Sequence, residues 1–147
     1  EGRGVEQSDE KAVELYRRSA ESGNSAAQNN LGWMYQEGRG VEIDNALAAQ
    51  WYLTAAEQGD AVAQHNLGLM FLEGAGVEED HAVALNWFRR AADQDYPPAM
   101  CSLGQAYEQG VGVDSDMKKA VFWYNKAAEF GDAEAEEKLR SLAEDTE

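Results

Sequence analysis

The chain repeats its own sequence at a fixed interval of 36 residues. Ala-Gln-Asn-Asn-Leu-Gly at positions 27–32 returns as Ala-Gln-His-Asn-Leu-Gly at positions 63–68. The same frame continues at Ala99, Leu103 and Gly104, with a faint echo at Ala135 and Leu139. A fixed period of this size indicates a solenoid, in which each unit buries its apolar face only against its neighbours. Repeat arrays usually work through their surface, so the functional question is what this surface binds.

Each unit reads as two helices, A and B, joined by glycines. In one copy, helix A is predicted to begin after Asp60 and to end at 74–77, where the glycines can adopt the positive φ of a helix C-terminus. Asp80 then caps helix B. Equivalent caps are predicted at Asn24 and Asp132 for helix A, and at Ser8, Asp44 and Asp116 for helix B. Tyr96 takes the cap position in the remaining copy, where Pro97 and Pro98 set the first turn.

Small and aromatic residues recur at fixed positions and predict how the helices pack. Gly32, Gly68 and Gly104 lie in the middle of helix A, where glycine costs about 1 kcal/mol relative to alanine. A cost repeated in every copy indicates that helix B crosses too closely to leave room for a side chain. The recurring aromatics are expected to fill the core: Trp51, Trp87, Trp123, Tyr16, Tyr52, Phe88 and Tyr124.

The repeat frame predicts one continuous array. Residues 24–59, 60–95 and 96–131 are expected to be full repeats, and 132–147 a polar closing helix. Residues 1–23 are expected to hold only the loop and helix B of a repeat whose helix A is missing. That leaves an apolar face on Ala12, Leu15 and Tyr16, which is expected either to meet upstream repeats or to pair with another chain.

Charge narrows the class of partner. The formal net charge is −16, which argues against nucleic acid and anionic membrane surfaces, because phosphate binding depends on Lys and Arg. From Gly40 to Phe88 there is no Lys or Arg, while acidic residues continue throughout. This segment would steer a basic partner toward itself, unless it serves only to keep the protein soluble.

The sequence leaves the compartment open. No stretch approaches the roughly 18 uninterrupted apolar residues of a membrane span, so direct membrane insertion is not expected. Residue 1 falls inside a repeat, and we expect the natural N-terminus to lie upstream. A single cysteine, Cys101, and the lack of an Asn-x-Ser/Thr site are compatible with a reducing compartment without proving one.

The combined pattern resembles a known family. Ala-x-x-x-Leu-Gly-x-x-Tyr, then Gly-x-Gly-Val, an Asp, and Trp-Tyr-x-x-Ala-Ala-Glu-x-Gly-Asp is similar to the Sel-one-like repeat, and the best copy runs from Ala27 to Val62. The resemblance implies an all-α, right-handed α/α superhelix of antiparallel helix pairs, related to tetratricopeptide arrays. It also implies adaptor or scaffold roles. Two departures matter: the disulfide-rich bacterial branch of the family has paired cysteines in each repeat and this chain does not, and the family's pattern fails after residue 139, at Arg140 and Ala143.

The resemblance also implies where a ligand lies. In the related tetratricopeptide proteins, helix A lines a concave groove that holds peptides. Transferring that geometry by position predicts a groove lined by Asn29, Asn30, Trp33, Gln36, His65, Asn66, Leu69, Leu72, Cys101, Gln105 and Glu108. The expected partner is a neutral to basic protein segment with apolar anchors.

Within this groove, alternatives remain for the most informative residues. Trp33 beside Leu69 and Leu72 would make a binding hot spot, or the indole would simply fold over its own helix. Asn30 and Asn66 would bond the backbone of an extended peptide, or would bond between neighbouring helices.

No enzyme, cofactor or metal site is expected. Ser-x-x-Lys occurs at Ser8 and Ser115, as in penicillin-recognising enzymes, but Ser-Asp-Asn and Lys-Thr-Gly are absent, so a β-lactam enzyme is a remote alternative. His65 and Cys101 share one repeat position and could face the same groove. Adjacent helix axes lie about 8–10 Å apart, which is too far for the direct contact that a catalytic Cys–His pair needs. The thiol is expected to fill a gap between helices. Two histidines and scattered aspartates do not predict a zinc or calcium site.

Overall fold

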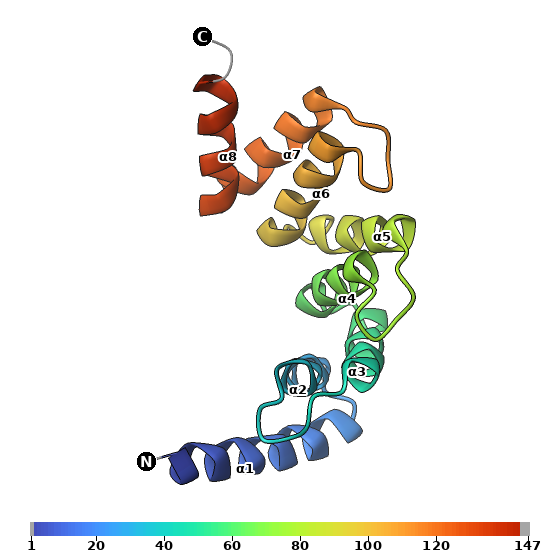
Figure 1. The fold of residues 1–147 in the computed structure, drawn as a ribbon, viewed down its shortest axis with the longest axis vertical. Coiled ribbons are helices and arrows are strands. Elements are labelled where there is room, and N and C mark those ends of the chain that lie inside the picture. Colours follow the sequence, from blue (N-terminus) through green and yellow to red (C-terminus); the bar gives the residue numbers. More distant parts are fainter. Residues whose placement is uncertain (1, 145–147) are drawn as a thin grey trace. The chain divides into compact units, whose positions relative to one another are not determined.

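The structure, a computed structural model, describes the backbone of residues 2–144 and the side chains of residues 7–144. Within this range the chain forms eight α-helices and no β-strand (Figure 1). It divides into two compact units, Glu1–Glu79 and Asp80–Glu147. The all-α solenoid of helix pairs that the sequence predicts is confirmed.

The first unit holds four helices, each packed on the next in chain order: α1 Gly2–Glu21, α2 Ser25–Glu37, α3 Asn45–Glu57 and α4 Ala61–Glu73. The second unit has the same plan: α5 His81–Ala92, α6 Pro97–Gln109, α7 Met117–Glu129 and α8 Ala133–Glu144. Residues 1 and 145–147 of the predicted end segments lie outside the described residues.

The predicted capping residues begin most of the helices. Asn24, Asp60 and Asp132 each accept a hydrogen bond from the backbone N–H three residues later, at 2.8 to 2.9 Å. Asp44, Asp80 and Asp116 do the same for α3, α5 and α7. Tyr96 makes no side-chain cap for α6, which instead starts on two prolines. These caps satisfy backbone donors that helix geometry leaves unpaired.

Ser8 is the exception, because it lies inside α1 rather than at its start. The predicted loop at the N-terminus is helical from Gly2. In the later copies the equivalent loop packs against an earlier helix: a Cβ on Gly40 would lie 2.4 Å from the carbonyl carbon of Asp9 in α1. The helical backbone of residues 2–4 therefore differs from the loop that later copies form at the equivalent positions.

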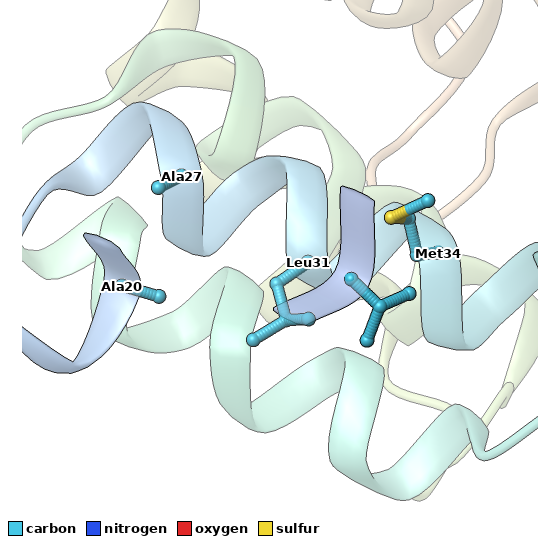
Figure 2. Close-up of a cluster of buried hydrophobic side chains, with 5 residues drawn as sticks. Ala20, Ala27, Leu31 and Met34 are labelled. Atoms are coloured by element: carbon cyan, nitrogen blue, oxygen red, sulfur yellow. The ribbon is translucent and has the colours of Figure 1, made fainter. Parts of the chain in front are cut away.

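The core is built from the repeated small and apolar positions. Between α1 and α2 it comprises Val13, Ala20, Ala27, Leu31 and Met34 (Figure 2). Trp51 of α3 is partly buried and packs against this cluster. A Cβ on Gly32 would lie 2.9 Å from the Tyr52 ring, and one on Gly104 would lie 2.6 Å from the Tyr124 ring. The close crossing predicted from the mid-helix glycines is confirmed at both positions.

Two buried amides tie consecutive repeats together. Gln28 and Gln64 donate from Nε2 to the carbonyl oxygens of Ala20 and Ala56, at 3.0 and 3.1 Å. Both carbonyls lie near the C-terminal end of the preceding helix and also accept from a backbone N–H, that of Gly23 and that of Gly59, so each amide adds a second bond to its carbonyl. Both glutamines are 3% exposed, so the cost of burying an amide is offset by these bonds.

Candidate protein-interaction surface

Trp33 is the most exposed member of the predicted groove, with 42% of its surface accessible. It lies on α2 with the Arg39 guanidinium 5.5 Å from its ring centroid. It helps line an open pocket of about 250 Å³ whose other walls include Tyr16 and Ala12 of α1 and Asn30 of α2. Neither Leu69 nor Leu72 lines this pocket. The Trp33 side chain is therefore accessible to a partner, and it shares its pocket with residues of α1 rather than with Leu69 and Leu72.

Arg39 is held in place from α1. Its guanidinium makes two-pronged contacts with the Asp9 carboxylate, with donor–acceptor distances of 3.0 to 3.1 Å. Two-pronged arginine–carboxylate pairs fix orientation as well as charge. The pair therefore sets where Arg39 meets the indole of Trp33, a feature that no repeat pattern predicts.

Of Asn30 and Asn66, Asn66 makes a bond between helices, which was one of the two alternatives for this pair. Asn66 of α4 donates from Nδ2 to Oδ1 of Asn29 in α2, at 3.0 Å. This bond joins successive A helices and occupies one donor that a bound peptide would need. Asn30 is half-buried in the wall of the Trp33 pocket.

Gln36 and the remaining first-unit positions are only partly accessible. Gln36 accepts at Oε1 from the Tyr52 hydroxyl, at 2.8 Å, which anchors it to α3. His65, Leu69 and Leu72 lie half-buried on α4. They offer a limited apolar surface beside the Asn66–Asn29 bond.

In the second unit the predicted positions of α6 bond to neighbouring helices. Gln105 donates to Glu134 of α8 at 2.6 Å, and Glu108 accepts from the Tyr124 hydroxyl. Lys138 of α8 donates to the same Glu108 carboxylate at 3.3 Å. The hydroxyl bond and then the lysine hold the pKa of Glu108 below its usual value, although partial burial opposes this.

Cys101 does not line an open groove, which corrects its placement among the ligand-contacting residues. Its side chain is 3% exposed and belongs to the buried residues of α6 in the second unit. Burial, reinforced by the Glu134 and Asp132 carboxylates, raises the pKa of the thiol to about 12. The thiol is protonated at neutral pH and fills space between helices.

The two Ser-x-x-Lys matches lie at ordinary surface positions. Ser8 is exposed within α1. Ser115 lies in the loop before α7 and donates to the backbone carbonyl of Glu108 at 3.4 Å. Within the described residues, no group of three or more His, Cys, Asp or Glu is placed to hold a metal ion.

Comparison with known protein families identifies the repeat. The Sel1 repeat model matches residues 1–24, 25–60, 61–96 and 97–132. These matches cover most of the 147 residues. The chain belongs to the Sel1 repeat family.

Solved Sel1 structures share the fold. A Sel1 repeat protein from Oxalobacter formigenes is 44% identical with a TM-score of 0.75, covering 78% of this chain and 46% of its own. The antigen c5321 of uropathogenic Escherichia coli, which displays an SLR fold, is 44% identical with a TM-score of 0.80, covering 83% of this chain and 26% of its own. This chain thus spans less than half of either relative.

A third structure supports the fold alone. Cysteine-rich protein B of Helicobacter pylori is 22% identical with a TM-score of 0.70, covering 89% of this chain and 94% of its own. No curated protein matches the chain. Sel1 repeat proteins generally act as scaffolds that bind other proteins. None of the helices described here has the length and apolar character needed to cross a bilayer.

At two linked positions of the Sel1 repeat, one on each of two packed helices, the middle of the chain has different residues from the repeats on either side. Arg17 of α1 donates to the Tyr35 hydroxyl of α2 at 2.9 Å, and 72 residues later Arg89 of α5 donates to the Tyr107 hydroxyl of α6 at 3.3 Å. The residues halfway between, Leu53 of α3 and Phe71 of α4, can make no such bond.

An open apolar pocket lies at this altered position. We call it the α3–α4 pocket; its volume is about 230 Å³ and its walls include Ala46, Leu53, Leu67, Phe71, Gly76 and Val77. Leu53 is 39% exposed at its edge. The groove prediction missed this pocket, because it followed helix A alone. Aligning the copies at both helices reveals the Arg-to-Leu and Tyr-to-Phe changes in the sequence itself.

Proposed function

We propose that this chain is a non-enzymatic interaction scaffold that holds a segment of another protein along its A helices. The observation that carries the proposal is the exposed Trp33 on a Sel1 A helix, beside a pocket that reaches α1. Tryptophans in pockets are frequent hot spots of protein interfaces. A scaffold of packed helices is preorganised, which lowers the entropy cost of holding a partner.

The chemistry of the surface favours a neutral to basic segment with an apolar anchor. The net charge of −16 would attract positive charge and repel phosphate-bearing partners. Relatives in the Sel1 family bind proteins, which agrees with this class of partner.

A binding experiment tests the proposal. The purified protein serves as bait in a lysate of its source, and the captured partner is then titrated against wild type and the Trp33→Ala, Leu69→Ala variant. We expect a tenfold or greater loss of affinity with unchanged helical circular dichroism. Phe130→Ala, which removes an aromatic that is more exposed than Trp33 (51% against 42%), is the control and should bind normally. Equal affinity of wild type and the double variant would refute the groove.

Self-association through α1 is a second candidate, favoured by one observation. Leu15 is 66% and Tyr16 36% exposed, whereas Tyr52 and Tyr124 at the position of Tyr16 are fully buried. With Ala12 they form an apolar face of the kind that pairs. Sedimentation at rising concentration should then show a dimer that Leu15→Glu abolishes. A concentration-independent monomer would exclude this role.

A further inference from the structure

We propose that the α3–α4 pocket is a docking site for a basic segment of another protein, which inserts one aliphatic or aromatic side chain. The pocket is separate from the surface around Trp33, since no residue lines both. It therefore adds a second contact surface to the first unit.

The pocket lies where two side chains, Leu53 and Phe71, differ from their counterparts in the neighbouring repeats. An arginine and a tyrosine hydrogen-bond across the helices in the copies on either side, Arg17 to Tyr35 and Arg89 to Tyr107. Changing only one partner would leave a guanidinium or a hydroxyl without its bond, which costs stability. With Leu53 and Phe71 both positions are apolar and no polar group is orphaned. The result is an apolar opening where the copies on either side place a polar bridge.

The size and lining of the pocket indicate one side chain as the inserted group. Drug-sized ligands occupy about 300–1,000 Å³, whereas this pocket offers about 230 Å³. Its walls carry no charged residue, and Gln50 is the only polar side chain among them. A single apolar anchor in a pocket is the usual centre of an interface hot spot.

Charge around the pocket selects the residues that flank the anchor. Glu57 lies one helical turn after Leu53 on α3, and Glu78 directly follows the lining residue Val77. Both carboxylate side chains are exposed, and no Lys or Arg occurs from Gly40 to Phe88. Lysine or arginine beside the anchor would complement this rim and be steered toward it. A second copy of this chain, with a net charge of −16, is a poor complement.

The chain itself supplies the variant that closes the pocket. Leu53→Arg with Phe71→Tyr recreates the bridge that already spans α1–α2 and α5–α6, so this double variant should fold as wild type does. Val62→Arg is the matched control. Val62 is 40% exposed, similar to Leu53, and lies on α4 outside the pocket, so it adds the same charge without filling the opening.

The probe is a random twelve-residue peptide library displayed on phage, selected on wild-type protein and counter-selected on the Leu53→Arg, Phe71→Tyr variant. Enriched peptides are synthesised and titrated by isothermal calorimetry and by amide chemical shifts. We expect a leucine, isoleucine, methionine or aromatic residue next to Lys or Arg. Affinity should fall at least tenfold in the double variant and less than threefold in Val62→Arg, with shifts centred on α3 and α4.

Three outcomes would overturn the proposal. No enrichment over the double variant would mean that the pocket selects nothing. Acidic or anchor-free peptides would contradict the stated partner. Self-association of wild type that the double variant abolishes, measured by sedimentation, would make a second copy the occupant. Because Trp33 and Leu69 are unchanged in every variant here, failure of this proposal leaves the groove proposal standing, and the reverse also holds.

Discussion

At the scale of single residues, the side chain that a repeat position can hold depends on the helix that packs across it. Gly104 lies under the Tyr124 ring, and an added Cβ would come within 2.6 Å of that ring. Tyr124 is fully buried and its hydroxyl is bonded to Glu108, so the ring cannot move aside freely. The glycine is therefore required by packing although it weakens its helix.

Replacing Gly104 by alanine tests this balance. Alanine should gain about 1 kcal/mol of helix propensity, while overpacking against the ring costs about 1–3 kcal/mol. We expect a net loss of up to about 2 kcal/mol in the free energy of unfolding, measured by urea denaturation. In a Tyr124→Leu background the same change should be neutral or stabilising. A stabilising Gly104→Ala in the wild type would show that the ring yields.

At the scale of helices, charged side chains join α6 to both α7 and α8. Glu108 accepts from the Tyr124 hydroxyl and from Lys138, and these contacts lower its pKa. Its counterpart Gln36 makes the equivalent bond to Tyr52 without a charge. At this repeat position the second unit therefore has an acid-sensitive bond where the first unit has an uncharged one.

The pH dependence of stability tests this bond. Because the pKa of Glu108 is lower in the folded protein than its usual value, its contribution is present above that usual value and is lost as pH falls through the folded pKa. We expect Glu108→Gln to flatten this acid-side loss, in unfolding free energies measured from about pH 6 down to about pH 3. An unchanged slope would mean that Glu108 titrates alike in both states. Glu129→Gln, an exposed change at the end of α7, is the control.

At the scale of the whole molecule, net charge opposes the compact state. Twenty-eight acidic residues face twelve Lys and Arg, so ion pairs such as Arg39–Asp9 cannot neutralise most of the acidic residues. Self-repulsion of this kind attracts positively charged partners at some cost in stability. It also makes the fold sensitive to salt.

Salt should therefore raise the melting temperature. Between about 10 mM and about 100 mM NaCl the Debye length falls from about 30 to about 10 Å, which screens repulsion across the repeats. We expect a higher Tm by circular dichroism at the higher salt, and a smaller increase for Glu57→Gln, Glu73→Gln, Glu78→Gln. A Tm that falls with salt would show that local ion pairs outweigh the net repulsion.

Much of the fold could be read from the repeat, because each feature depends on residues near in sequence. The caps at Asp44, Asp60 and Asp80 bond backbone groups three residues away, and local spacing reveals such bonds. Ser8 carries the same local signal, but the prediction of a cap there was wrong, because Ser8 lies inside α1; in a later copy the equivalent loop packs against a helix distant in sequence. The candidate site was less readable, because contacts between helices decide exposure there.

The sequence by itself determined the period, the all-helical units, most of the caps and the acidic character, since these follow from composition and short-range spacing. Only the tertiary structure decided which repeated positions face solvent. It buried Cys101, joined Asn66 to Asn29, placed Trp33 against α1, and left Leu53 and Phe71 around an opening. The physical reason is that a side chain's exposure and bonds depend on the neighbouring helices, and one residue pair changed across such a contact alters the surface without altering the repeat.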